Sequence, residues 1–96
     1  MSKAKEKSGR TLAYWFDGKG RTLTLAQTES GELFWIGSTA DLKEMAEKFT
    51  ARKFYHESDG NFAAWCVRRI KKYIGGEYSV VASNIAPSEV NYVVDV

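Results

Sequence analysis

The chain has 96 residues and a formal net charge of +2, which suits one domain that buries a modest core. Hydrophobic residues make up 44% of it and include three Trp, five Tyr and five Phe, a composition typical of globular proteins. The single cysteine cannot form an internal disulfide, and one cysteine with one histidine is too few ligands for a zinc site. No apolar run approaches the roughly 20 residues of a membrane span.

Residues 1–10 are predicted to form a disordered basic tail. Four of the 14 cations and one of the 12 acids fall there, which leaves ten cations and eleven acids for a near-neutral body, residues 11–96. The tail has no apolar stretch of the kind that a signal peptide needs. Together with the unpaired cysteine, this favours a cytoplasmic location.

Three β-strands are predicted over 11–16, 21–29 and 33–37, joined by the turn sequences DGKG and SGE into an antiparallel meander. Alternation places one set of side chains toward the core: Leu12, Tyr14, Phe16, Leu23, Leu25, Phe34 and Ile36. The opposite face then carries Ala13, Trp15, Thr22, Thr24, Ala26, Leu33 and Trp35.

A first helix is predicted over 38–53. Ser38 or Thr39 caps its start, and an apolar stripe recurs at helical spacing: Leu42, Met45, Ala46 and Phe49. The stretch 54–61 is predicted to be a connector, with an extended piece at 53–56.

A second helix is predicted over 62–74, capped by Asp59 or Asn61 and ended by Gly75 and Gly76. Two last strands, 78–83 and 90–96, are predicted to close a hairpin around NIAPSE. The order is therefore β-β-β-α-α-β-β: a single small α+β domain whose two helices pack on one face of an antiparallel sheet. Whether the last two strands join the first three in one sheet stays open. The apolar terminal strand VNYVVDV would offer a sheet edge to a second copy, so a homodimer is also left open.

The stretch WCVRRIKK (65–72) holds four cations within the second helix, namely Arg68, Arg69, Lys71 and Lys72, with Trp65 among them. On a helical wheel all five lie opposite the apolar arc, which includes Tyr73 and Cys66. One interpretation is an ordinary solvated face, on which Trp65 covers the core edge and an arginine stacks on it. The other is a binding surface for phosphates or acidic protein, with Trp65 stacking on the partner.

Trp15 and Trp35 raise a similar choice. They are core residues if the C-terminal strands cover their face of the sheet, and an exposed aromatic platform for a partner if nothing does.

Signals for catalysis are weak. His56, Glu57 and Asp59 lie together on the predicted connector, but no nucleophile accompanies them in a recognisable context. Cys66 falls on the apolar arc, where cysteines are usually inert. No metal, nucleotide or cofactor motif is present in the sequence, so we expect no enzyme activity and no cofactor.

Two functions are consistent with these patterns. The first is a small module that contacts nucleic acid, or another acidic surface, through Trp65 and the four cations, with Trp15 and Trp35 as further contacts. The alternative is a phage- or plasmid-type inhibitor or adaptor, for example an anti-defence protein, that acts by protein–protein binding. Neither involves a membrane.

Overall fold

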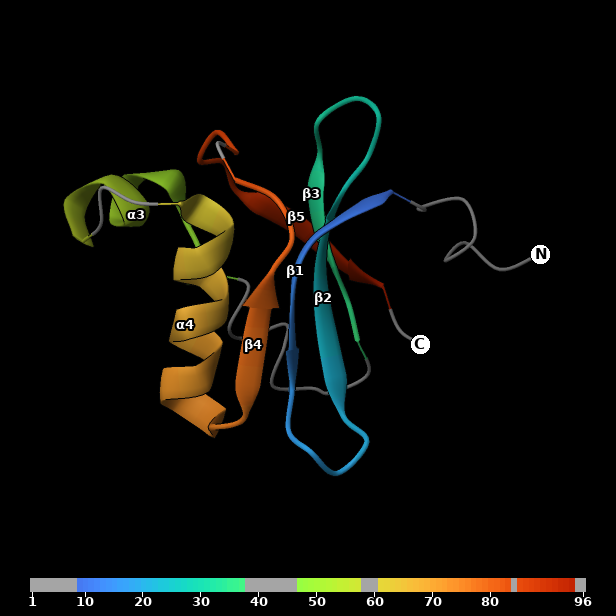
Figure 1. Cartoon of the computed structure of the whole chain (residues 1–96). Helices are drawn as coiled ribbons and strands as arrows, with labels where there is room; N and C mark the ends of the chain where they lie inside the picture. Colours follow the sequence, from blue (N-terminus) through green and yellow to red (C-terminus); the bar gives the residue numbers. More distant parts are fainter. Residues whose placement is uncertain (1–8, 38–46, 58–60, 84, 95–96) are drawn as a thin grey trace.

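The computed structural model describes residues 9–37, 47–57, 61–83 and 85–94, which form one sheet with helices packed on one face (Figure 1). The basic tail, the capped start of the first predicted helix and the Asp59 cap lie outside the described residues. The elements are β1 (Arg10–Phe16), β2 (Thr22–Gln27), β3 (Leu33–Ile36), α3 (Ala51–Glu57), α4 (Phe62–Ile74), β4 (Glu77–Val80) and β5 (Val90–Val94). The predicted α+β class and element order are confirmed.

All five strands join one sheet in the order β4-β1-β2-β3-β5. Neighbours from β4 to β3 pair antiparallel, whereas β5 pairs parallel to β3. The predicted closing hairpin of the last two strands is therefore wrong, because β4 and β5 occupy opposite edges. The segment that joins them spans the width of the sheet, about 19 Å for five strands, and its length allows this.

The predicted faces are right for β2 and inverted for most of β1 and β3. Trp15 pairs with Leu23, and Leu25 pairs with both Ala13 and Trp35. Each neighbouring strand is thus shifted by one residue from the expected register, and such a shift exchanges the two faces of a strand. The side chains buried on the α4 side are Ala13, Trp15, Leu23, Leu25, Leu33 and Trp35.

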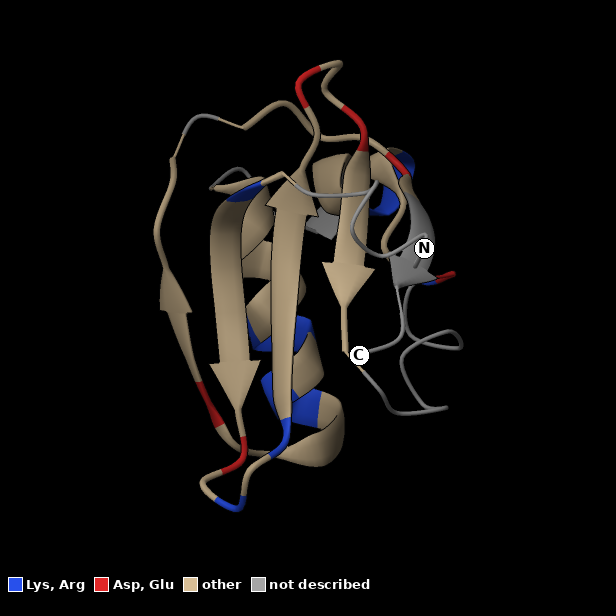
Figure 2. Cartoon of the chain, turned by 90° about the vertical axis from the view of Figure 1, so that its right-hand side faces the viewer, with Lys and Arg blue, Asp and Glu red and all other residues tan. Residues whose placement is uncertain are grey.

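The opposite face carries Tyr14 and Phe16, which were expected in the core and are 38% and 36% exposed. Phe34, expected in the core as well, is fully buried on that face. A β-bulge between Thr11 and Ala13 lets Leu12 reach the core as predicted, with no exposed surface. Figure 2 views the sheet from this side, with α4 behind it.

Helix α4 has the bounds that its sequence predicts. Asn61 caps it, since its Oδ1 accepts a hydrogen bond from the Ala64 N–H at 3.1 Å. Gly75 ends it with a φ of 76° and donates its own N–H to the Lys71 carbonyl at 2.8 Å. The helix packs on β1 and β4.

The region before α4 differs from the prediction. Residues 53–56 are helical within α3 rather than extended. A turn at 47–48 and the non-helical Phe49 and Thr50 interrupt the long helix expected to continue to residue 53. The Thr50 hydroxyl accepts a hydrogen bond from the Lys53 N–H at 3.1 Å, so a new helix starts there. Phe49 is buried, as the predicted stripe requires.

Candidate functional site

Trp65 is not a surface residue. Its side chain is 4% exposed and packs against the rings of Phe49, Phe54 and Phe62, with centroid distances of 5.8, 5.7 and 5.8 Å. The helical wheel assumed that α4 packs against the protein on one side only. In the structure two sides are packed: the sheet covers one, and Phe49 together with α3 covers the other. The expectation that Trp65 stacks on a bound partner is therefore wrong.

Trp15 and Trp35 are also core residues, each with no exposed surface. The Trp15 indole N–H donates to the Gly75 carbonyl oxygen, and the Trp35 ring packs on Phe49 at 5.8 Å. Both face α4 because of the register described above, so neither can contact a partner without opening the core.

The four predicted cations remain at the surface of α4. Arg68, Lys71 and Lys72 are exposed, and Arg69 is half-buried. Figure 2 shows these basic positions along the helix behind the sheet. Because α4 contains no acidic residue, nothing within the helix neutralises them.

The partners of these cations differ. Lys71 Nζ lies 3.7 Å from a carboxylate oxygen of Glu77, an ion pair exposed enough to contribute little to stability. The Arg69 guanidinium carbon lies 5.8 Å from the Trp65 ring centre. This is the arginine–tryptophan contact expected if the basic side of α4 is an ordinary solvated face. Within the described ranges, Arg68 and Lys72 form no ion pair.

The fold adds two residues that sequence reasoning missed. Tyr73, expected on the apolar arc, is 46% exposed, and its hydroxyl accepts a hydrogen bond from Arg69 Nη2 at 3.4 Å. Lys48, from the turn before α3, lies with its Nζ 4.9 Å from the Tyr73 ring centre. The spacing of Arg69 and Tyr73 by four residues could have indicated their contact. No local pattern could have brought Lys48 to them.

We define the α4 basic surface as Arg68, Arg69, Lys71, Lys72, Lys48 and Tyr73. It contains cations from two separate segments and one exposed aromatic ring. Chemically, it can attract an anionic partner and offer several hydrogen-bond donors to phosphate or carboxylate oxygens.

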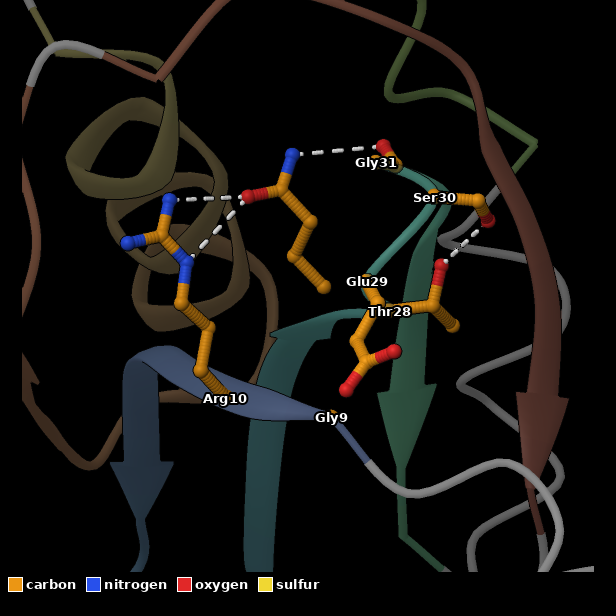
Figure 3. A pocket seen from close by; sticks show the side chains of 7 residues that line it. Gly9, Arg10, Thr28, Glu29, Ser30 and Gly31 are labelled. Carbon is orange, nitrogen blue, oxygen red and sulfur yellow. Dashed lines mark hydrogen bonds between the residues drawn. The ribbon is translucent and has the colours of Figure 1, made fainter.

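A second group of polar residues lines an open hollow at the start of β1 (Figure 3). Arg10 donates through Nε and Nη2 to Gln27 Oε1, at 3.3 and 2.9 Å, and Gln27 Nε2 donates to the Gly31 carbonyl at 3.2 Å. These side chains satisfy one another and join the β1 end to the turn after β2. The arrangement is that of a structural network rather than of a ligand site.

Cys66 is a free cysteine buried in α4. Burial raises the pKa of the Cys66 thiol, which keeps it protonated and unreactive. The described residues contain no cluster of three or more side chains able to hold a metal ion. In the same parts of the chain, no helix is long and apolar enough to cross a membrane.

Comparison with known proteins gives no relative: no family model, no curated protein and no solved structure matches this chain. The case for a function therefore depends on the residues of the chain itself.

Proposed function

We propose that this protein is a small, non-catalytic binding module that contacts nucleic acid through the α4 basic surface. The observation that carries this proposal is the exposure of Arg68, Lys71 and Lys72 on a helix without acids, with Glu77 the one acidic partner recorded for them among the described residues. A surface on which exposed cations are clustered is the electrostatic signature of a phosphate-binding protein.

The residues of this surface divide into two roles. Arg68 and Lys72 are one helical turn apart and present their charged ends to phosphates, which fixes the orientation of the partner. Tyr73 takes the role first assigned to Trp65, because the residue is 46% exposed and its aromatic ring can stack on a base. The basic residues of the N-terminal segment 1–10 would add phosphate contacts.

A single-strand and a double-strand oligonucleotide, each labelled for fluorescence anisotropy, test this function over a range of salt concentrations. The logarithm of affinity is expected to fall linearly with log salt, by about 0.7 to 0.9 for each phosphate neutralised. Arg68→Glu and Lys72→Glu should each weaken binding and reduce this slope. Lys19→Glu, in the exposed β1–β2 turn, changes the net charge equally and is the matched control.

Absence of binding at low salt, or a control that weakens binding as much as Arg68→Glu, would refute a specific nucleic-acid surface on α4. The second outcome would indicate that only net charge matters.

The alternative function, a phage- or plasmid-type inhibitor or adaptor, uses the same surface against an acidic protein. It is favoured by the exposed Tyr73 and by Tyr55 of α3, which is 71% exposed, since tyrosine and arginine are enriched at protein interfaces. Nuclease treatment separates the two functions: a stoichiometric protein partner that stays bound after the treatment and is lost with Arg68→Glu would support the alternative.

A further inference from the structure

The outer edge of β4 is a strand edge with a defined set of unpaired backbone groups. The Val81 N–H donates to the Leu12 carbonyl at 2.8 Å, one residue beyond the pair formed by Val80 and Ala13. In an antiparallel ladder, a bond at this position means that Val80 and Ala13 are a non-hydrogen-bonded pair. The backbone N–H and C=O of Val80 then point away from β1. Val80, and by alternation Tyr78, therefore direct their backbone groups outward, while Ser79 and Glu77 bond to β1.

The edge is open in the described part of the molecule. The strand β4 is the first in the sheet order, and nothing lies beyond it at the left margin of the view in Figure 2. The last residue of β4 and the residue that follows it have solvent-exposed apolar side chains, with Val80 39% and Val81 62% exposed. Exposed apolar residues beside unpaired backbone groups are what an added strand covers.

We propose that β4 pairs antiparallel with β4 of a second copy, about a two-fold axis that passes beside Ser79. This inference goes beyond the proposed binding function, and the two concern neighbouring parts of the molecule because Lys71 of α4 pairs with Glu77 of β4. In this register the Val80 N–H of each copy meets the Tyr78 carbonyl of the other, and the Tyr78 N–H meets the Val80 carbonyl. Every outward backbone group of both edges is then satisfied.

The side chains are compatible with that register. Tyr78 of one copy lies opposite Val80 of the other, an aromatic and β-branched pair of the kind that stabilises sheets. Glu77 lies opposite Val81, so the two acidic side chains do not face each other. Ser79 lies opposite its own symmetry mate, where two hydroxyls can hydrogen-bond.

The helices also have room. Each α4 packs on β1 and β4 of its own copy, so adding two strand spacings places the two helix axes about 10 Å apart. This is close to the distance at which helices normally pack. The joined sheet would contain both copies' strands in one continuous layer.

The two-fold symmetry of the proposed dimer makes it testable by charge substitution, because Ser79 of one copy would contact Ser79 of the other. The Ser79 side chain is half-exposed on the side of the sheet away from α4, so a charged residue there is tolerated by the single copy. Sedimentation equilibrium at protein concentrations from about 10 µM to 1 mM should show a reversible dimer for the unchanged chain. Its dissociation constant should fall within this concentration range, as expected for a small interface. Ser79→Lys and Ser79→Glu alone should each weaken the dimer by at least about tenfold.

Mixing Ser79→Lys with Ser79→Glu should restore association as a one-to-one heterodimer. Ser79→Thr, which keeps the hydroxyl, should dimerise like the unchanged chain, and equal melting temperatures would show that all the variants fold. A chain that stays monomeric up to about 1 mM would overturn the proposal. So would charged variants that each dimerise as well as the unchanged chain, since the contact would then lie elsewhere.

A backbone variant tests the same pairing without adding charge. Val80→Pro removes an outward N–H that has no partner within the sheet, and proline is tolerated at such edge positions. It should delete half of the proposed intermolecular bonds and weaken the dimer by about tenfold or more. Val80→Thr, which keeps the N–H, should not. Equal dimerisation of the two variants would overturn the proposed pairing.

Discussion

The indole N–H of Trp15 donates a hydrogen bond to the carbonyl oxygen of Gly75, and this bond joins β1 to the residue that ends α4. Directly after it, Gly76 brings the backbone against the same indole and against β1. The turn from α4 into β4 is therefore fitted around one tryptophan side chain.

This close approach predicts that Gly76→Ala is far more damaging than an equivalent change elsewhere. A Cβ at Gly76 would lie 2.6 Å from the Phe16 carbonyl oxygen and would collide with the Trp15 indole. Its φ of 87° adds the ordinary penalty of a side chain in the left-handed region. Urea unfolding should show a loss of about 3 kcal/mol or more, combining that penalty with displacement of the core.

Gly18→Ala is the matched control for that measurement. Gly18 has a similar φ of 79°, but a Cβ there meets nothing within 4 Å. Its loss should be limited to the conformational penalty, about 1–2 kcal/mol. Equal losses at the two glycines would show that the Trp15 contact has no effect on stability.

Trp15 and Trp35 differ in the hydrogen bonding of their indole nitrogens, and this difference gives a second prediction. Both are fully buried, but the indole nitrogen of Trp35 has no hydrogen-bond partner among the described residues, whereas that of Trp15 does. Replacement by Phe opens a similar cavity at each site. At Trp35 it also removes a buried, unsatisfied N–H, whose presence costs about 1–3 kcal/mol. Thermal or chemical unfolding should show Trp35→Phe to be less destabilising than Trp15→Phe by about that amount.

Substitutions at Trp65 test whether this residue stabilises the core or contacts a partner. Because it packs among Phe49, Phe54 and Phe62, Trp65→Ala should lower the free energy of unfolding by about 3–5 kcal/mol. Trp65→Phe keeps most of the packing and should leave the affinity for oligonucleotides unchanged. An affinity loss with Trp65→Phe that exceeds the loss with Tyr73→Leu would contradict the assignment of Tyr73 as the exposed ring.

Asp17 predicts a dependence of stability on acid pH. Its carboxylate accepts hydrogen bonds from Arg21 Nε at 2.6 Å, from the Lys19 N–H at 2.7 Å and from the Arg21 N–H at 3.1 Å. The Arg21 side chain first, and then these backbone donors, lower the pKa of Asp17 from 3.8 to about 2. Since the folded-state pKa is the lower one, the contribution is complete above about pH 4 and disappears as the pH falls toward 2. Asp17→Asn should therefore flatten the curve of stability against pH in this window, as measured by urea unfolding between pH 2 and pH 5.

The sequence was most informative where structure is local. The DGKG turn, the Asn61 cap and the Gly75–Gly76 stop each use residues that demand one backbone conformation, and the hairpin and α4 follow from them. The predicted register failed because both faces of β1 and of β3 carry large apolar side chains, so alternation alone could not choose between the two faces. The extended piece predicted at 53–56 failed because its aromatic residues resemble a strand, whereas tertiary contact of Phe54 with Phe62 and Trp65 stabilises a helix.

The candidate site was predictable in its charges and not in its aromatic ring. The four cations of α4 follow from helical spacing alone. Whether Trp65 or Tyr73 is exposed depends on where Phe49 and α3 pack, and a helical wheel contains no information on that. The same holds for Lys48, which reaches Tyr73 only through the tertiary fold.

The parallel pairing of β3 with β5 affects the order in which the strands can pair while the chain is being synthesised. The β1-β2-β3 meander is contiguous in the chain and closes through short loops, whereas β3 obtains its second neighbour, β5, only after residues 90–94 have been synthesised. Until then the nascent sheet has a bare strand rich in aromatic and aliphatic side chains, which invites aggregation. Pulse-labelled hydrogen exchange should accordingly find the amides of β1 and β2 protected before those of β5. Simultaneous protection would mean that β5 docks within the first folding step.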